Sequence, residues 1–145
     1  MLRSLGLAGT MTLVLLTAPA NAFDVMSPDY GGRVEQYEAR LARARARGEP
    51  IRIGPTECDS SCTLYLANPQ SCVSEGAVFG FHAPWFGGPE GGVVDPRMTA
   101  IFAAHYKPRL REAFMAHVRR HGNQAPAPML RITGRQLAAY GYRLC

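Results

Sequence analysis

Four cysteines constrain this chain more strongly than any other feature of its sequence. Cys58, Cys62, Cys72 and Cys145 are even in number, so two disulfides can join them. Four cysteines allow three pairings, and their spacing does not choose among them. We favour Cys62 with Cys72 and Cys58 with Cys145, a pairing that would hold the C-terminal segment on the rest of the chain, and the other pairings stay open. A zinc site from Cys58, Cys62, Cys72 and His82 is the alternative, although the paired CxxC spacing of zinc knuckles is absent.

The N-terminal segment has the pattern of a secretory signal peptide. Arg3 precedes a short apolar run over residues 5–16, and Ala20-Asn21-Ala22 has the small-x-small pattern that signal peptidase accepts. The run is shorter than the roughly 20 apolar residues that a membrane-spanning helix needs. We therefore predict a signal peptide at residues 1–22, no stable membrane anchor after its cleavage, and one domain at residues 23–145 that is exported to the periplasm or secreted. Export brings the cysteines into an oxidising compartment.

Composition and charge narrow the class of protein and of partner. The chain has 145 residues, of which 47% are hydrophobic and 19% charged, so one globular domain fits better than a disordered, collagen-like or coiled-coil chain. The formal net charge is +5, and several arginines gather on the outer face of the helix expected over residues 33–47. A solvated helix face explains these arginines, and no aromatic residues interleave with them, so we predict no nucleic-acid partner.

Periodicity predicts strands that alternate with helices. Apolar residues at steps of three and four predict a helix over residues 33–47 that ends at Gly48, and small polar residues at 58–62 precede a further helical segment. Extended segments are expected at 23–26, 50–54, 77–81 and 129–132, and further helices at 97–106, 108–120 and 135–140. The order of these elements predicts an α/β fold with a small parallel sheet and flanking helices. We interpret residues 84–96, which are rich in glycine and proline, as a loop without strands.

Three polar features converge on one edge of this expected sheet. They are the Gly31-Gly32 turn, the Ser60-Ser61 helix start, and His82 at the end of a strand. A serine at a helix N-terminus can act as a nucleophile, a histidine can take its proton, and backbone N–H groups can hold a developing oxyanion. Taken singly, Ser60 is better explained as a helix cap and His82 as a hydrogen-bonded structural histidine. Their order and spacing together indicate acyl-transfer chemistry.

The same segments resemble the Clp-type serine peptidases and their wider relatives of the ClpP/crotonase fold. Residues 27–32, Ser-Pro-Asp-Tyr-Gly-Gly, resemble that family's Ser-Pro-Gly-Gly turn, and residues 51–54 resemble the strand that follows. Residues 58–62, Cys-Asp-Ser-Ser-Cys, resemble the turn that carries the nucleophile, and residues 80–84, Gly-Phe-His-Ala-Pro, resemble the strand end that carries the base. Small exported bacterial proteins with these two segments are the most similar group, and the resemblance covers residues 23–121.

The resemblance implies a role for each matching residue. Ser60 would be the nucleophile, His82 the general base, and the Gly31-Gly32 turn with Ser61 would form the oxyanion site through the N–H groups of Gly32 and Ser61. Ser61 is the competing nucleophile. Asp29 and Tyr30 are inserted in the glycine turn, and the family's downstream acid has no clear counterpart. Asp95 is the candidate for that acid, with a turn or helix cap as its alternative role.

Two main functions follow from these residues. One is a periplasmic serine hydrolase or peptidase that uses a Ser60–His82 dyad. The other is a catalytically inactive ClpP-like domain that binds a peptide or protein, and a disulfide-stapled structural protein is a third reading. We predict no cofactor and no metal, because His117 and His121 lack the glutamate of a metalloprotease helix. An oligomer is compatible with either function.

Overall fold

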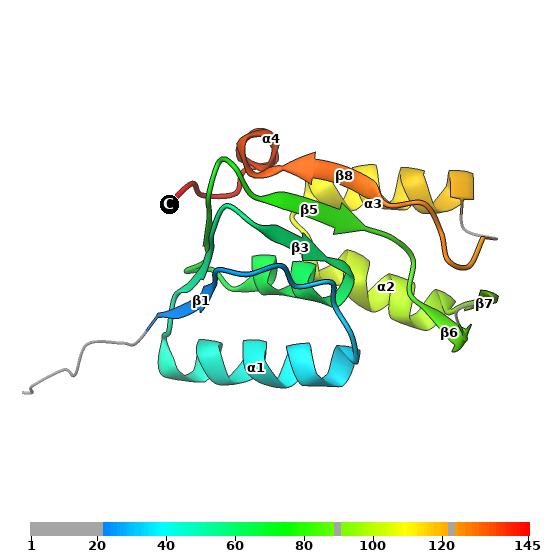
Figure 1. The fold of residues 1–145 in the computed structure, drawn as a ribbon, viewed down its shortest axis with the longest axis horizontal. Coiled ribbons are helices and arrows are strands. Elements are labelled where there is room, and N and C mark those ends of the chain that lie inside the picture. The colour runs from blue at the N-terminus through cyan, green and yellow to red at the C-terminus, as the bar shows by residue number, and fades with distance from the viewer. Residues whose placement is uncertain (1–21, 89–90, 122–123) are drawn as a thin grey trace, which may run out of the picture.

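The computed structural model describes residues 22–88, 91–121 and 124–145, so the predicted signal peptide lies outside the described residues except for Ala22. The described elements form one mixed α/β unit (Figure 1). In chain order they are β1 (Phe23–Val25), α1 (Val34–Arg47), β2 (Ile51–Ile53), β3 (Glu57–Asp59), the 3-10 helix η1 (Ser60–Ala67), β4 (Cys72–Val73), β5 (Val78–Phe81), β6 (Trp85–Gly88), β7 (Gly91–Val94), α2 (Pro96–His105), α3 (Pro108–His121), β8 (Leu130–Thr133) and α4 (Gly134–Ala139).

Six of the strands form two small sheets of three strands each. In the first sheet, β1, β2 and β4 pair in parallel in that order. In the second sheet, β3 and β5 pair in parallel, β8 joins β5 antiparallel, and Asp29 forms a parallel bridge to Cys58 on the other side of β3. The predicted α/β class and its parallel pairing are confirmed, while the ClpP/crotonase-like architecture stays a prediction. β3 and β5 end at the same edge, which is the right-hand end of Figure 1.

Helix α1 forms where the apolar stripe predicts it. Tyr37, Leu41 and Ala44 recur at steps of four and three, and all three are buried in the hydrophobic core, where Tyr37 packs on Tyr65 of η1. The helix ends at Gly48, whose φ of 62° lies in the left-handed region that glycine adopts without steric cost. α1 connects β1 to β2 and lies along the lower side of the molecule in Figure 1.

Helices α2 and α3 also match their predicted ranges within one or two residues. The Asp95 side chain accepts hydrogen bonds from two backbone N–H groups of the first turn of α2, and Pro96 follows it as the first helical residue. Pro108 begins α3 in the same way. Both helices contribute to the one hydrophobic core through Phe102, Leu110 and Phe114.

The glycine-rich segment after β5 differs from the prediction. Residues 84–96 were expected to be a loop without strands, but Trp85–Gly88 and Gly91–Val94 form the antiparallel hairpin β6–β7. Gly87 pairs with Gly92 across it, and a side chain on Gly92 would meet the Phe86 carbonyl oxygen at 2.1 Å. The glycines therefore do not interrupt the strands. They allow the two backbones of the hairpin to approach closely.

All four cysteines form disulfides, but the favoured pairing is wrong. The structure joins Cys58 to Cys62 and Cys72 to Cys145. β3 runs directly into η1, which brings Cys62 back within a Cα–Cα distance of 5.3 Å of Cys58. The segment after α4 pairs with Val73 of β4 through Leu144, which places Cys145 beside Cys72. Since all four cysteines are in disulfides, the alternative of a zinc site that uses their thiolates does not match this structure.

Two disulfides indicate a protein that folds in an oxidising compartment outside the cytoplasm. Among the residues described, no helix has the length and apolar character needed to cross a membrane.

Candidate functional site

The candidate nucleophile lies on a strained turn between a strand and a helix. Ser60 follows β3 and begins η1, and its φ is 56°. It is the only non-glycine residue with positive φ among residues 22–88, 91–121 and 124–145. An L-residue adopts this left-handed conformation at a cost of about 1–2 kcal/mol, and such strain persists where surrounding contacts over-determine it, often at functional sites. Strand-turn-helix elbows of this kind present a serine hydroxyl to a substrate.

Several contacts hold the Ser60 elbow in this conformation. The Thr63 hydroxyl donates a 2.6 Å hydrogen bond to the Ser60 carbonyl oxygen, and the buried Tyr106 hydroxyl donates to Thr63 at 2.7 Å. The Cys58–Cys62 disulfide crosses the elbow from the strand before it to the helix after it. The Ser60 hydroxyl itself makes no hydrogen bond to any described residue, so it does not serve as the helix cap that sequence reasoning offered as its alternative role.

The glycine turn packs directly against this elbow. The Asp29 carboxylate accepts hydrogen bonds from the Gly31 N–H at 3.0 Å and from the Tyr37 hydroxyl at 2.5 Å, which fixes the turn. Gly31 has a φ of 83°, and a side chain there would meet the Ser60 Cβ at 2.6 Å. Asp29 is therefore the residue that shapes this turn.

Ser61 has a different role from Ser60. Its side chain is 1% exposed, and its hydroxyl donates a 2.8 Å hydrogen bond to the Gly32 carbonyl oxygen. This contact joins the glycine turn to the elbow. Because the Ser61 hydroxyl is buried and engaged, the geometry favours Ser60 as the nucleophile.

Two backbone N–H groups remain free beside Ser60. Neither the Gly32 N–H nor the Ser61 N–H is hydrogen bonded within the part of the chain that the structure describes, whereas the Gly31 N–H is occupied by Asp29. Gly32 and Ser61 are the two donors that the resemblance implies for an oxyanion site. Gly31 instead contributes its positive φ and its lack of a side chain.

His82 lies immediately beyond β5 with its ring in a defined tautomer. Its side chain is 4% exposed and packs on Trp85, with 4.8 Å between the ring centroids. The Nδ1 atom is 2.8 Å from the Ala83 carbonyl oxygen, and because a carbonyl only accepts, Nδ1 carries the proton. Nε2 is then the free acceptor in the neutral ring. Burial lowers the pKa of His82 from its ordinary value of 6.5, which favours the neutral ring, the form that can accept a proton.

Ser60 and His82 line the same cavity. The cavity has a volume of about 330 Å³, and both residues line it together with the glycine turn and Ser61. No hydrogen bond joins the Ser60 hydroxyl to the imidazole in this structure, so a catalytic contact between them would have to form when a substrate binds. The other lining side chains are Tyr30, Val34, Pro84, Trp85, Phe102 and Met129. None of the described lining residues is an acid, a lysine or an arginine.

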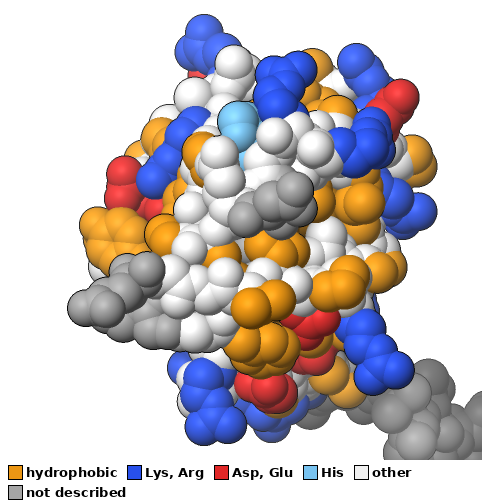
Figure 2. Space-filling view, turned by 90° about the vertical axis from the view of Figure 1, so that its right-hand side faces the viewer, with side chains coloured by type: hydrophobic (Ala, Val, Ile, Leu, Met, Phe, Trp, Pro, Cys, Tyr) orange, Lys and Arg blue, Asp and Glu red, His pale blue; other side chains and the backbone are white. Residues whose placement is uncertain are grey.

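Figure 2 looks onto this end of the molecule, toward which β3 and β5 run. Hydrophobic side chains and uncharged groups occupy much of the centre of this face, while lysine and arginine side chains lie around its outline. Acidic side chains also lie among the hydrophobic ones in the lower part of this face, and apart from His82 the residues that line the cavity carry no ionisable acid or base other than Tyr30.

Asp95 is not placed behind His82. Its carboxylate caps α2 by accepting from the Arg97 and Met98 N–H groups, which is the structural role considered as its alternative. The Ala83 carbonyl occupies the Nδ1 position of His82, where a triad acid would bind. The predicted residues Ser60, Ser61, His82, Gly31 and Gly32 are therefore brought together, whereas Asp95 does not contact the imidazole.

Sequence reasoning missed a buried acid that lies outside the cavity lining but acts on His82. Asp59 is 2% exposed, and its carboxylate is paired with Arg131 of β8 at 2.7 Å. Burial raises the pKa of Asp59, and the nearby Arg131 guanidinium opposes that effect. The negative charge of Asp59 acts on His82 in the direction that raises the pKa of the imidazole, without overcoming burial. The strand β3 reads Glu57-Cys58-Asp59, so no apolar pattern in the sequence marked Asp59 as the buried acid.

Gly80 makes room for this acid. It is paired with Asp59 across β3 and β5, and a side chain at Gly80 would lie 2.4 Å from an Asp59 carboxylate oxygen. Gly80 is thus required by the buried carboxylate beside it.

Comparisons of the chain with protein-family models, with curated proteins and with solved structures find no match in any of the three.

Proposed function

We propose that this protein is an exported serine hydrolase that acts in the periplasm on an ester or amide through a Ser60 acyl-enzyme. The observation that carries the proposal is the positive φ of Ser60 on a strand-to-helix elbow, in the same cavity as His82. The resemblance to Clp-type serine peptidases supports a peptide substrate. The neutral and apolar lining of the cavity supports an acyl group without charge.

The proposed reaction uses groups whose positions are described above. The Ser60 oxygen attacks the substrate carbonyl carbon while His82 Nε2 takes its proton. The N–H groups of Gly32 and Ser61 donate to the resulting oxyanion, and the protonated His82 then gives its proton to the leaving group. Water, activated by His82, hydrolyses the acyl-enzyme and regenerates Ser60. The Ala83 carbonyl holds the His82 tautomer in place of a carboxylate.

A fluorophosphonate probe, which reacts with activated serines, tests this proposal. The wild-type protein should be labelled at Ser60, and Ser60→Ala should abolish labelling. His82→Ala should slow labelling by about 100-fold or more, as expected for loss of a general base. Ser61→Ala is the matched control: it should keep labelling, although more slowly, because its hydroxyl supports the Gly32 turn. Labelling that survives Ser60→Ala would show that the assignment of the nucleophile is wrong.

A catalytically inactive peptide-binding domain is the second candidate. It is favoured by the missing hydrogen bond between Ser60 and His82 and by the position of Asp95 at the start of α2. This function predicts no labelling of the wild type and peptide binding that Ser60→Ala leaves intact. Fluorescence of the single tryptophan, Trp85, reports such binding because Trp85 lines the cavity.

A further inference from the structure

The largest cavity described in this molecule is separate from the Ser60 cavity. It has a volume of about 550 Å³ and shares no lining residue with the Ser60 cavity. Its walls come from the end of η1 and the segment after it, the junction of α2 and α3, the segment after α4, and the last turn of α1. This volume is in the range of cavities that hold small organic molecules.

Basic side chains from three separate parts of the chain line this cavity. Arg45, Lys107 and Arg143 are accompanied by His105, and no acid is found among the described residues of its wall. None of the three permanent cations forms an ion pair with any described carboxylate. The cavity therefore has a positive charge that the protein itself does not balance.

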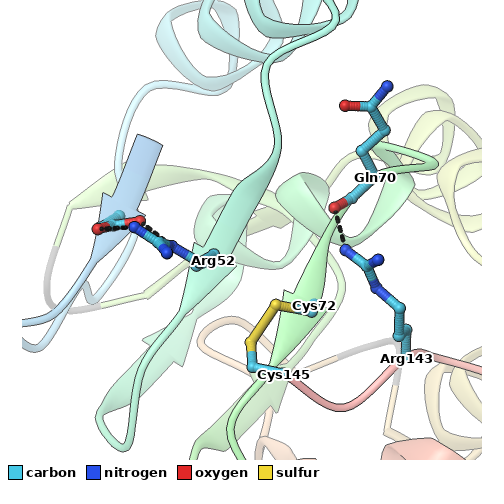
Figure 3. Close-up of polar contacts among 6 residues, drawn as sticks. Arg52, Gln70, Cys72, Arg143 and Cys145 are labelled. Carbon is cyan, nitrogen blue, oxygen red and sulfur yellow. Dashed lines mark hydrogen bonds and ion pairs between the residues drawn. A yellow bond between two sulfur atoms is a disulfide. The ribbon is translucent and has the colours of Figure 1, made fainter. Parts of the chain in front are cut away.

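Backbone carbonyls hold these cations in place. Arg45 donates to the Ala67 carbonyl oxygen at 2.7 Å, and Arg143 donates to the Gln70 carbonyl oxygen at 2.8 Å. Figure 3 shows the Arg143 guanidinium directed at Gln70, beside the Cys72–Cys145 disulfide that anchors its segment. Lys107 donates to the Gly141 carbonyl oxygen. Each head group uses one hydrogen bond in this way, and a guanidinium has five N–H donors and an ammonium three, so most of their donors are available to a ligand.

Two other polar side chains of the wall, Ser71 and Asn68, are already engaged. The Ser71 hydroxyl donates to the Tyr65 carbonyl oxygen at 2.6 Å, and the Asn68 amide group bonds the Glu49 carbonyl oxygen and the Gln70 N–H. The remaining surface is apolar or aromatic, from residues such as Leu66, Tyr106 and Tyr142. Lys107 also lies 5.0 Å from the centroid of the Tyr142 ring. The cations and the Tyr142 hydroxyl, which accepts from the Lys107 N–H, therefore supply free donors in this cavity beside apolar side chains such as Leu66.

We propose that this cavity binds a phosphate or sulfate ester carried on a ring-shaped or apolar body. A phosphate or sulfate ester presents three terminal oxygens, so it can accept from as many as three cations, whereas a carboxylate presents two oxygens. The apolar and aromatic side chains of the wall, such as Leu66 and Tyr106, would contact the organic part of the ligand. This site is independent of the proposed hydrolase function because it contains neither Ser60 nor His82.

Isothermal titration calorimetry with phenyl phosphate tests the proposal. Phenyl phosphate should bind, and benzoate, which carries the same ring on a carboxylate, should bind at least about tenfold more weakly. The double variant Arg45→Gln/Arg143→Gln should lose at least about tenfold in affinity for phenyl phosphate, because two charge-assisted contacts are removed. The matched control Arg97→Gln/Arg119→Gln removes the same charge from exposed helix positions outside this cavity and should stay within about twofold of wild type.

Two further arms identify the source of the anion and guard against misfolding. Vesicles that contain phosphatidic acid test a lipid headgroup: binding that the double variant weakens would place the ester on a lipid, and binding of phenyl phosphate alone would place it on a soluble molecule. In the wild-type protein, phenyl phosphate should shift the backbone amide NMR signals of Ala67, Lys107 and Arg143. Equal affinity for benzoate, equal loss in both double variants, or shifts elsewhere in the chain would each overturn the proposal. Ser60→Ala should leave the affinity unchanged, so this test is separate from the labelling experiment.

Discussion

Replacing Gly31 with alanine tests whether the glycine turn and the Ser60 elbow form one rigid unit. Gly31 has a φ of 83°, so an alanine there pays the left-handed backbone cost of about 1–2 kcal/mol. The new Cβ would also lie 2.6 Å from the Ser60 Cβ and 2.9 Å from both the Asp59 carbonyl oxygen and the Ser61 nitrogen. Backbone atoms cannot move aside cheaply, and overpacking of this kind costs about 1–3 kcal/mol. Gly31→Ala should therefore lower the free energy of unfolding by about 2–5 kcal/mol.

Gly48→Ala is the matched control, because it has the same backbone requirement without the contact. Gly48 has a φ of 62°, and the nearest atom to an added Cβ is the end of the Gln70 side chain at 3.9 Å. Its cost should be the backbone cost alone, about 1–2 kcal/mol. Urea unfolding followed by circular dichroism gives both values, provided that the two variants keep the wild-type dependence on urea concentration.

The labelling rate with the fluorophosphonate probe supplies a second measurement on the same variants. Gly31→Ala should slow labelling of Ser60 under conditions where the variant is still folded, whereas Gly48→Ala should not. If Gly31→Ala costs no more stability than Gly48→Ala and labels at the wild-type rate, the close packing of the glycine turn on the elbow is wrong.

Two further predictions concern charge and covalent structure. Burial lowers the pKa of His82 in the folded protein, so the unfolded chain binds a proton at this residue more readily than the folded protein does. The free energy of unfolding should therefore be unaffected by this group above pH 6.5 and should fall as the pH drops below 6.5. His82→Gln should remove this part of the pH dependence in urea titrations, and an unchanged pH profile would refute the assignment. Cys72→Ala/Cys145→Ala should lower the free energy of unfolding by about 4 kcal/mol, because this disulfide spans 73 residues. Cys58→Ala/Cys62→Ala should lose less chain-entropy stabilisation, because that disulfide spans 4. If thermal melting shows only the second double variant to be destabilised, the loop-length argument fails.

Local sequence patterns predicted the elements whose boundaries and apolar faces can be identified from neighbouring residues. The stripe of Tyr37, Leu41 and Ala44, with Gly48 after it, was sufficient for α1, and Pro108 marked the start of α3. The nucleophile segment and His82 were also placed at one sheet edge correctly, because neighbouring parallel strands end together.

Features that depend on distant partners could not be predicted in this way. The Cys72–Cys145 disulfide depends on Leu144 pairing with β4, and no pattern near either cysteine indicates that contact. The β6–β7 hairpin is built on glycines whose value lies in close approach to the opposite strand, which composition alone does not reveal.

The site was incomplete in the sequence for the same reason. Asp59 is buried and paired only because β8, which carries Arg131, returns antiparallel to β5 from far along the chain. Asp95 has both the residue type and the sequence position of a helix cap, and its carboxylate accepts from the first turn of α2 accordingly.

The Cys72–Cys145 bond makes the chain from β4 to Cys145 a covalent ring. A protease that cuts any single peptide bond inside this ring would leave both fragments joined, so the nicked protein would keep its mass apart from one added water. On a denaturing gel the cut would become visible only after reduction. Limited proteolysis of this protein should therefore be read on paired reduced and unreduced samples, and the β6–β7 hairpin, which lies inside the ring, can be nicked while the two pieces stay together.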